Sequence, residues 1–522
     1  MKRIEGLDSL RGVLLIFMTI NHLIWISGGW SRLQWVTLQP LGQVGAAEGF
    51  IFISGLLAGL IYSKPEMSQA DVTRKAWHRA ATIYFYHIGC LILVCAWFII
   101  APHFFGNAHD VLAANLPNFI AAPVQASLLS TVLLNRPFYF DILPIYILFM
   151  LALPLAIALF RKGLSWLVLV LSFGLWVLAS YLHQDMLKPL YAIFSEDLSV
   201  SVGYFDPFAW QLLFIVGAAI GFRQRTQPIH WFKHTPVTVV VFIATLLFTA
   251  AHHGAFAQFG LHQGIMYALA DKPELGWLRV LNLGLLAYVI GWLIHRFPSY
   301  THTVPLSLLG KHSLQVFAWQ SILIFLAAPA LTSIRMQNSY AFVILALTAT
   351  LFIPAMLSQR KASRGVTPIF HWGTVAVGLL AVSLSAKAIE SALKPAPVSF
   401  GDTSFSLKVK VENLKDMETD LMVLLYAEHD SLMGPPSAFG GSFSPEAVSQ
   451  GVELGKFKSA KYALFVLQDR DKNNQLTFSS VGMPMEPFGY SNNPRLNGPP
   501  SMDDIGFNHL EDNTQTVSLI HF

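Results

Sequence analysis

Charged side chains are scarce in this 522-residue chain, and cysteine is scarcer still. Asp, Glu, Lys and Arg make up 12% of the residues, whereas hydrophobic residues make up 54%. Soluble domains carry about 25% charged residues, so a single water-soluble globular domain is excluded. The two cysteines, Cys90 and Cys95, lie five residues apart within one apolar run, which excludes a disulfide framework and a CxxC redox or zinc motif. The composition therefore favours a largely membrane-embedded protein.

The few charges are unevenly distributed. Residues 1–396 contain 25 Lys and Arg against 14 Asp and Glu, a net charge of +11, whereas residues 397–522 contain 9 against 16, a net charge of −7. The sequence Lys-Pro-Ala-Pro at residues 394–397 separates the two parts and is typical of a linker. We therefore expect a basic, hydrophobic part followed by an acidic, polar domain.

Eleven segments are apolar over roughly the length that a membrane-spanning helix needs, about 20 residues. Several are shorter than ideal, so the expected fold class is an α-helical polytopic membrane protein with about ten or eleven transmembrane helices. The predicted spans are residues 12–30, 47–62, 82–101, 138–160, 164–182, 207–222, 236–251, 277–295, 313–334, 339–358 and 370–388.

The positions of Lys and Arg favour one orientation of these spans. Short cytoplasmic loops retain positive residues. With the amino end inside, the inner loops contain 17 Lys and Arg, and the outer loops and their edges contain 6. Eleven crossings then place the carboxyl-terminal domain outside.

Polar residues form a stripe within the first predicted span. Asp8, Arg11, Leu15, Met18 and His22 are spaced by 3, 4, 3 and 4 residues, which places them on one helical face. Arg11 and His22 should lie about 16 Å apart along the axis, so an interfacial Arg11 would place His22 near the middle of the membrane. Asn21 lies on the adjacent face.

The stripe has two interpretations. Ionisable groups within a membrane face the helix bundle or a water-filled cavity, and histidine is the usual general base near neutral pH. A packed His22 with an interfacial Asp8–Arg11 ion pair is an equally good interpretation. The stripe alone identifies no reaction.

Other polar residues open later spans. Glu48 opens the second span, in which Ser54 precedes the GxxxG pair Gly55 and Gly59, a spacing typical of close helix packing. Asp141 and Asp206 open the fourth and sixth spans, where helix capping is the usual role of an aspartate.

Several motifs resemble those of membrane acyltransferases. Residues 7–12 (LDSLRG), followed by Asn21 and His22, resemble the opening of the integral-membrane acyltransferases. Residues 47–59 (AEGFIFISGLLAG) resemble the second helix of one branch, the OpgC family, whose members succinylate osmoregulated periplasmic glucans. The same family is matched by LPIY at 143–146, DPFAWQ at 206–211 and LGKHSL at 309–314.

This resemblance implies a reaction. Cytoplasmic acyl-CoA, either succinyl-CoA or acetyl-CoA, would be the donor, and a hydroxyl of a periplasmic or surface glycan would be the acceptor. His22 would be the base that activates the hydroxyl or would relay the acyl group, and Asn21 would stabilise the oxyanion. Asp8 and Arg11 would orient the inner vestibule or meet the donor, and Glu48 completes the candidate catalytic residues. Lys311 and His312 would bind the CoA phosphates, although Lys311 also fits simple positive-inside orientation. The implied substrate-binding residues are Ser54, Asp141, Tyr146, Asp206, Trp210 and Gln211.

The resemblance also divides the chain and suggests its location. Residues 1–365 would form the acyltransferase domain, and residues 366–396 an additional helix and linker, because the family usually ends after ten spans. Residues 397–522 would form a periplasmic domain. The expected location is the bacterial inner membrane, with the amino end in the cytoplasm and with acyl-CoA, a glycan and membrane lipid as partners; nucleic acid is not expected.

The carboxyl-terminal part has the period-two pattern of a small antiparallel β-sandwich. Strands are predicted at residues 404–411, 421–426, 462–467 and 516–520. Asp469, Asp471 and Asn473 resemble the start of a calcium loop, but an EF-hand would need Gly at 474 and Glu at 480, so an ordinary polar turn is an equal alternative. Residues 482–493 resemble a family of small secreted domains of unknown function with a transthyretin-like sandwich, and Phe488, Tyr490 and the neighbouring Asn residues suggest carbohydrate binding.

Two other functions remain open from the sequence. The polar stripe could line the pathway of a transporter or exporter of a glycan or acyl compound. Alternatively, the membrane part could be a non-catalytic anchor for the carboxyl-terminal binding domain.

Overall fold

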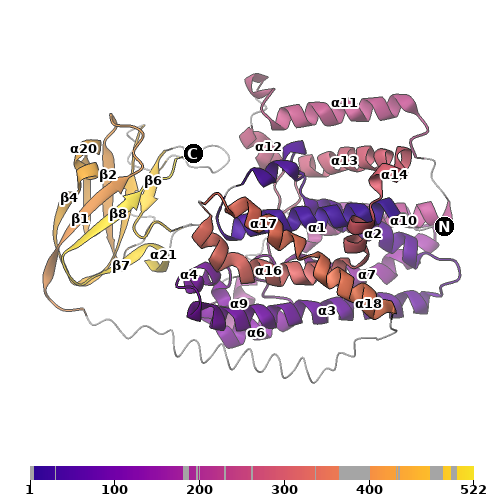
Figure 1. Ribbon diagram of the computed structural model, residues 1–522, viewed down its shortest axis with the longest axis horizontal. Helices are drawn as coiled ribbons and strands as arrows, with labels where there is room; N and C mark the ends of the chain where they lie inside the picture. The colour runs from indigo at the N-terminus through magenta and orange to yellow at the C-terminus, as the bar shows by residue number, and fades with distance from the viewer. Residues whose placement is uncertain are drawn as a thin grey trace. The chain divides into compact units, whose positions relative to one another are not determined.

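A computed structural model gives the structure of most of the chain (Figure 1). It forms two compact units, Met1–Leu393 and Lys394–Phe522. The structure describes residues 5–29, 31–179, 181, 187–194, 198, 200–227, 231–259, 263–335, 337–363, 400–428, 430, 432, 436–470, 476, 486–494 and 502–521.

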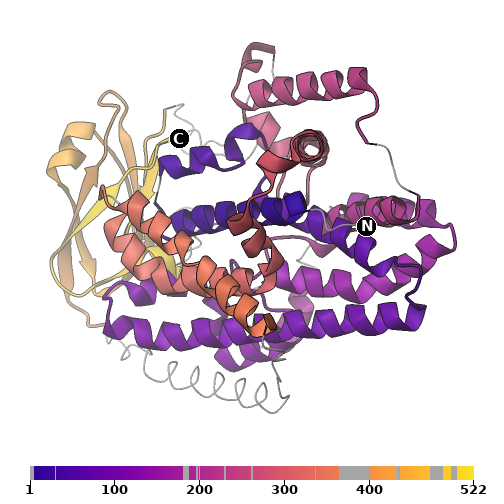
Figure 2. The ribbon, with the colours of Figure 1, turned by 45° about the vertical axis from the view of Figure 1, so that its right-hand side comes forward.

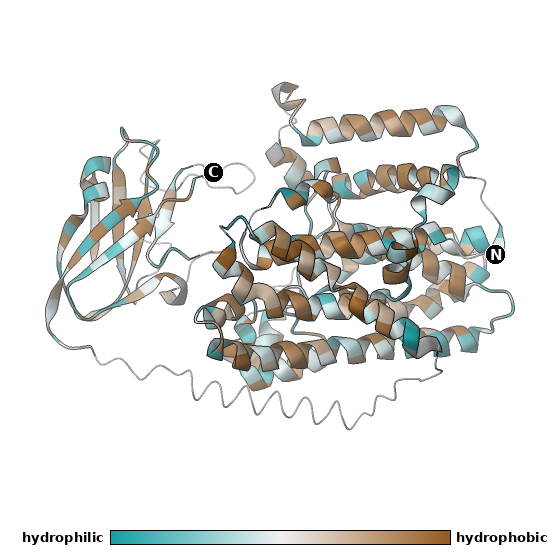
Figure 3. Ribbon diagram, viewed as in Figure 1, coloured by the Kyte–Doolittle hydropathy of each residue, from teal (hydrophilic) through white to brown (hydrophobic). Residues whose placement is uncertain are grey.

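The first unit is helical, as the hydropathy pattern predicts (Figure 3). Each of the first ten predicted spans overlaps a helix, and the eleventh, 370–388, lies outside the described residues. The corresponding helices are α1 (Glu5–Ile26), α2 (Ala46–Tyr62), α3 (Gln69–Ile100), α7 (Ile142–Arg161), α8 (Ser165–Ala179), α10 (Pro207–Thr226), α11 (Thr235–His252), α13 (Trp277–Arg296), α16 (Ser313–Ile334), and α17 (Tyr340–Ala349) with α18 (Phe352–Ser363).

Within the described part of the chain, seven helices are long and apolar enough to cross a membrane. They begin at Glu5, Gln69, Ile142, Thr235, Trp277, Ser313 and Tyr340. Two further apolar helices, Ala46–Tyr62 and Ser165–Ala179, are shorter. These helices fit a membrane protein.

Short helices connect the long ones. Between α3 and α10 lie α4 (Ala108–Ala113), α5 (Pro117–Ala121), α6 (Pro123–Thr131) and α9 (Lys188–Phe194); later come α12 (Gln263–Leu269), α14 (Pro298–Thr301) and α15 (Val304–Lys311). Figures 1 and 2 show α1 inside the bundle, where it contacts α2, α15 and α16.

Glycines allow two of these helix pairs to pack with their backbones in contact. A Cβ added to Gly55 of α2 would lie 2.1 Å from the carbonyl oxygen of Phe214, and one added to Gly221 of α10 would lie 2.1 Å from that of Leu56. Packing is predicted for the GxxxG pair of α2 and is confirmed, with α10 as the partner helix. Similarly, a Cβ on Gly12 of α1 would lie 2.1 Å from a carbonyl oxygen of α15.

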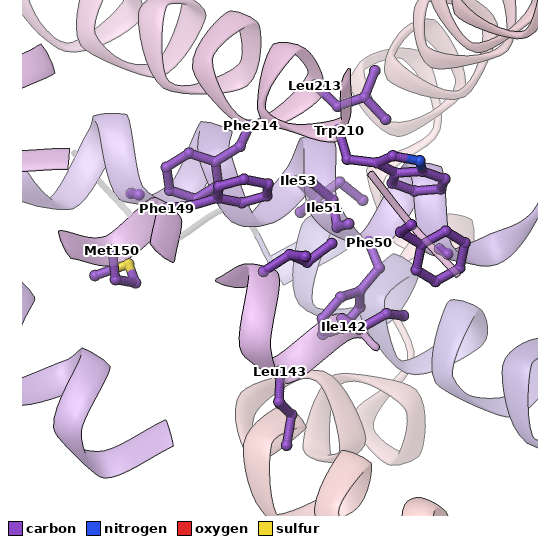
Figure 4. Close-up of a cluster of buried hydrophobic side chains, with 14 of the residues drawn as sticks. Phe50, Ile51, Ile53, Ile142, Leu143, Phe149, Met150, Trp210, Leu213 and Phe214 are labelled. Carbon is purple, nitrogen blue, oxygen red and sulfur yellow. The ribbon is translucent and has the colours of Figure 1, made fainter. Parts of the chain in front are cut away.

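Apolar side chains from α2, α7 and α10 fill the space around this contact (Figure 4). Phe149 and Phe214 pack with ring centroids 5.3 Å apart. Trp210, at the start of α10, is fully buried. Packing in this core therefore fixes the position of the first turn of α10, which Asp206 precedes.

The second unit is a β-sandwich of two sheets. One sheet has the order β4-β1-β8, and the other has the order β3-β2-β5-β6, with β7 also paired to β5. The bounds are β1 (Ser404–Glu412), β2 (Leu421–Ala427), β3 (Phe439–Phe443), β4 (Val452–Lys458), β5 (Ala460–Leu467), β6 (Phe488–Tyr490), β7 (Gly506–His509) and β8 (Asn513–Ser518), with helices α20 (Pro445–Gln450) and α21 (Met502–Ile505) between strands.

Alternate residues of β1, β2 and β5 form the sandwich core, as the period-two pattern predicts. The expectation of a purely antiparallel sandwich is wrong in one place, because β1 and β8 pair in parallel. The first and last strands of the unit meet at this pair, so no hairpin turn constrains their relative direction.

Candidate functional site

The polar face of α1 packs against α16. Arg11 Nη2 donates to Ser313 Oγ at 2.5 Å, and His22 Nδ1 lies 3.2 Å from Gln320 Nε2. Leu15, between the two contacts, is fully buried. The predicted stripe therefore exists as one face, and α1 and α16 run in the same direction.

His22 lies closer to the end of its helix than the sequence suggested. The first span was predicted at residues 12–30, but the helix runs from Glu5 to Ile26. The helix starts early because Asp8 and Gly12 pack on the backbone of α15. His22 is therefore about one turn from the end of α1.

Aromatic rings and an amide surround the imidazole of His22. Its ring centroid lies 5.8 Å from that of Trp25 and 5.1 Å from that of Tyr139. The amide oxygen Oε1 of Gln320 is buried and has no hydrogen-bond partner among the described residues. Turning that amide by 180° would let His22 Nδ1–H donate to Oε1, which leaves Nε2 as the basic nitrogen.

Asn21 and Ser54 also present buried polar atoms. Asn21 is 7% exposed and Ser54 is 4% exposed. Asn21 Oδ1 and Ser54 Oγ have no hydrogen-bond partner within the described part of the chain. Both side chains are therefore able to bind a polar substrate group without breaking an existing bond.

Glu48 forms a buried ion pair that sequence reasoning missed. Glu48 Oε1 accepts from Arg279 Nη1 at 2.7 Å, and the two side chains are 0% and 7% exposed. Glu48 Oε2 accepts from the N–H of Gly45 at 3.0 Å, which caps α2. Arg279 also donates to the carbonyls of Gln43 and Ala270. In the sequence, a lone Arg279 within an apolar span was the available signal of a buried partner.

Asp206 and Trp210 hold the loop that precedes α13. Asp206 Oδ1 accepts from the N–H groups of Phe208 and Ala209 at 2.7 and 3.2 Å. The prediction that Asp206 caps its helix is therefore confirmed. The Asp206 N–H donates to the carbonyl of Pro273 at 3.0 Å. Trp210 Nε1 donates to the carbonyls of Lys272 and Pro273 at 3.1 and 3.0 Å. The DPFAWQ motif therefore fixes the backbone at Lys272.

The other residues expected to bind substrate make internal contacts. Gln211 is bonded to Ser172 of α8 in both directions at 2.7 Å. Asp141 Oδ1 accepts from the N–H of Tyr204 at 2.8 Å instead of capping its own helix. The ring of Tyr146 lies 5.9 Å from that of Phe214 in the core.

Lys311 and His312 lie at the other end of α1 from His22. Lys311 is exposed at the end of α15, and the partly buried His312 precedes α16. The neighbouring Ser313 is the partner of Arg11. Lys311 and His312 therefore lie on the Arg11 side of α1, about 16 Å along the helix from His22.

The calcium expectation falls largely outside the described residues. Asp471 and Asn473 are not described, whereas Asp469 is. No group of three His, Cys, Asp or Glu side chains that could hold a metal occurs among the residues with described positions.

The amides near the expected carbohydrate surface are used within the sandwich. Asn492 Nδ2 donates to the carbonyl of Gly506, and Asn493 bonds Thr516 and Ser518 of β8. Both therefore have a structural role, which leaves the rings of Phe488 and Tyr490 as the carbohydrate candidates.

Comparison with known families gives two matches that do not overlap. Residues 409–518 match a family described as an uncharacterized protein conserved in bacteria (DUF2141). Residues 2–363 match the family described as OpgC protein, and this family supports a membrane acyltransferase-like role. Searches of curated proteins and of solved structures found no match. Since the second match covers more than half of the sequence, the chain belongs to the OpgC family.

Proposed function

We propose that this protein is an inner-membrane O-acyltransferase that moves a succinyl or acetyl group from cytoplasmic acyl-CoA to a hydroxyl of a periplasmic or surface glycan. The observation that carries the proposal is His22, which Gln320 orients and which follows Asn21, whose buried Oδ1 has no hydrogen-bond partner among the described residues. A base held by an orienting residue is the arrangement that acyl transfer to a hydroxyl requires.

The chemistry follows from this arrangement. His22 Nε2 takes the proton of the acceptor hydroxyl while the hydroxyl oxygen attacks the thioester carbonyl. The developing oxyanion accepts a hydrogen bond from the amide of Asn21. As the carbon–sulfur bond breaks, the proton passes from His22 to the leaving thiolate, which gives free CoA and the glycan ester.

The direction of transfer rests on the two ends of α1. Arg11, Lys311 and His312 would meet the CoA phosphates at the end that carries the cytoplasmic loops of the predicted topology. Their end of the helix is about 16 Å from His22, which the extended pantetheine arm would cover. The directions of helix packing agree with alternating crossings, because α1 and α16, the first and ninth spans, run the same way.

Radiolabelled acyl-CoA tests this function. The purified full-length protein should transfer label to cell-envelope glycans, and His22→Ala should lower kcat by roughly 100- to 10,000-fold, the usual contribution of a general base. His78→Ala is the matched control, because His78 is exposed on α3 and should leave kcat unchanged. Full activity in His22→Ala would exclude the proposed base, and a wild-type protein that never labels glycan would favour a transporter or an anchor.

A further inference from the structure

One cation near His22, the ammonium of Lys272, makes no ion pair with any of the described residues. Lys272 lies on the loop between α12 and α13, and its carbonyl and that of Pro273 accept from Trp210. A second tryptophan, Trp176, donates to the carbonyl of Leu275 at 2.9 Å. Two indole N–H groups therefore fix the loop, so the position of Lys272 is defined by the core.

The ammonium of Lys272 lies between aromatic rings. Nζ is 5.5 Å from the ring centroid of Trp25 and 5.8 Å from that of Phe205. Among the described residues it makes no hydrogen bond or ion pair. An acid close to it, Glu48, is already bonded to Arg279 and to the N–H of Gly45. Lys272 therefore carries a charge that the surrounding side chains do not neutralise through a direct contact.

Lys272 and His22 share one neighbour. Trp25 lies within 6 Å of both, since its ring centroid is 5.8 Å from that of His22 and 5.5 Å from Nζ of Lys272. A group that binds at His22 therefore has a cation within reach.

A partly buried ammonium without a hydrogen-bond acceptor is costly unless a ligand supplies one. In acyl transfer, the group that reaches His22 is the thioester carbonyl, and a dicarboxylic acyl group carries a second, ionised carboxylate a short chain away. An acetyl group has no such anion. The charge at Lys272 therefore distinguishes the two donors.

We propose that Lys272 binds the free carboxylate of a dicarboxylic acyl group and makes the enzyme selective for succinyl over uncharged acyl donors. This inference rests on the proposed acyltransferase function. Lys272 takes no part in bond making: the acceptor oxygen bonds to the acyl carbonyl carbon, the carbon–sulfur bond breaks, and the hydroxyl proton reaches the thiolate through His22. The lysine fixes the far end of the acyl chain, so it is a specificity-determining residue.

The test compares donors of equal chain length. Succinyl-CoA and butyryl-CoA each have a four-carbon acyl group but differ in the terminal carboxylate, and acetyl-CoA is a short neutral reference. With a neutral glucan oligosaccharide as acceptor, Lys272→Met should lower kcat/KM for succinyl-CoA by roughly 10- to 100-fold, the usual value of a charged hydrogen bond. Transfer from butyryl-CoA should be unchanged or faster, and Lys272→Arg should retain the succinyl preference.

Two controls separate the possible failures. Lys162→Met removes an exposed lysine that follows α7 and should leave kcat/KM unchanged for all three donors. Equal losses with all three donors in Lys272→Met, or an unchanged succinyl preference, would overturn the role of Lys272. A loss that appears only with an anionic acceptor would assign the carboxylate to the acceptor and also overturn the inference. If wild-type protein transfers none of the donors, the proposed function fails instead.

Discussion

Removing the charge of Glu48 should destabilise the membrane unit strongly. Glu48 and Arg279 are 0% and 7% exposed and 2.7 Å apart, so neither group can recover its hydration when its partner is lost. Breaking a buried pair by removing one partner costs about 3–5 kcal/mol. Glu48→Gln keeps the shape of the side chain but leaves the charge of Arg279 uncompensated. We expect an apparent melting temperature lower by roughly 5–15 °C.

The assay is thermal unfolding of the detergent-purified full chain, followed by intrinsic tryptophan fluorescence. The double variant Glu48→Gln/Arg279→Gln should recover part of the loss, because it leaves no unpaired charge. Arg74→Gln is the matched control: its ion pair with Asp71 is also 2.7 Å long but lies on the surface, so no measurable change is expected. Wild-type stability in Glu48→Gln, or strictly additive losses in the double variant, would refute the reasoning.

Two further predictions concern packing and pH. Gly12→Ala places a Cβ 2.1 Å from a carbonyl oxygen of α15 and should cost about 1–3 kcal/mol or more in thermal unfolding, whereas Gly89→Ala, with open space around it, should be neutral or stabilising. Burial lowers the pKa of Lys272, although Glu48 opposes that shift, so the preference for succinyl-CoA over butyryl-CoA should fall as the pH rises toward the lysine range. A preference that stays constant between neutral pH and the full titration of lysine would contradict this. The charged groups that face Lys272 are Glu48, Arg279 and Asp141.

The hydropathy pattern was sufficient to predict the helices but not their ends. Each of the first ten predicted spans overlaps a helix. α1 nevertheless begins at Glu5 instead of residue 12, because the polar residues at its start find partners: Ser9 bonds Thr303, and Glu5 lies 3.3 Å from His302. A hydropathy average treats such residues as outside the span, whereas tertiary contacts keep them helical.

In the sandwich, the predicted strands are those with alternating apolar residues. β3, β4, β6 and β7 were missed. The sequence FGGSF of β3 contains two glycines, and none of its residues is fully buried, so its position depends on hydrogen bonds to β2 and not on its own pattern. Edge strands are generally difficult to recognise for this reason.

The site was predicted only in part. Spacing identified the face of α1 that carries Arg11 and His22, because helical period is a local property. It could not identify Gln320 or Arg279, which are separated from their partners by 298 and 231 residues. Lys272 was counted in the sequence only as an outer-loop charge, since nothing local to it indicates that two tryptophans fix its backbone.

The hydrogen bonds of the predicted site residues separate those with a structural role from those that remain candidates for binding substrate. The polar side-chain atoms of Glu48, Asp206 and Trp210 bond to other groups of the protein. These three residues therefore have a structural role. Each buried polar atom left without a partner costs about 1–3 kcal/mol, and such atoms persist where a ligand satisfies them. Among the described residues, Asn21 Oδ1 is of this kind and lies beside His22 in the sequence, whereas Gln320 Oε1 accepts from His22 once its amide is turned. The same reasoning applies to the ammonium of Lys272, which makes no hydrogen bond or ion pair among the described residues, so the proposed acyl transfer would take place at the end of α1 that carries His22.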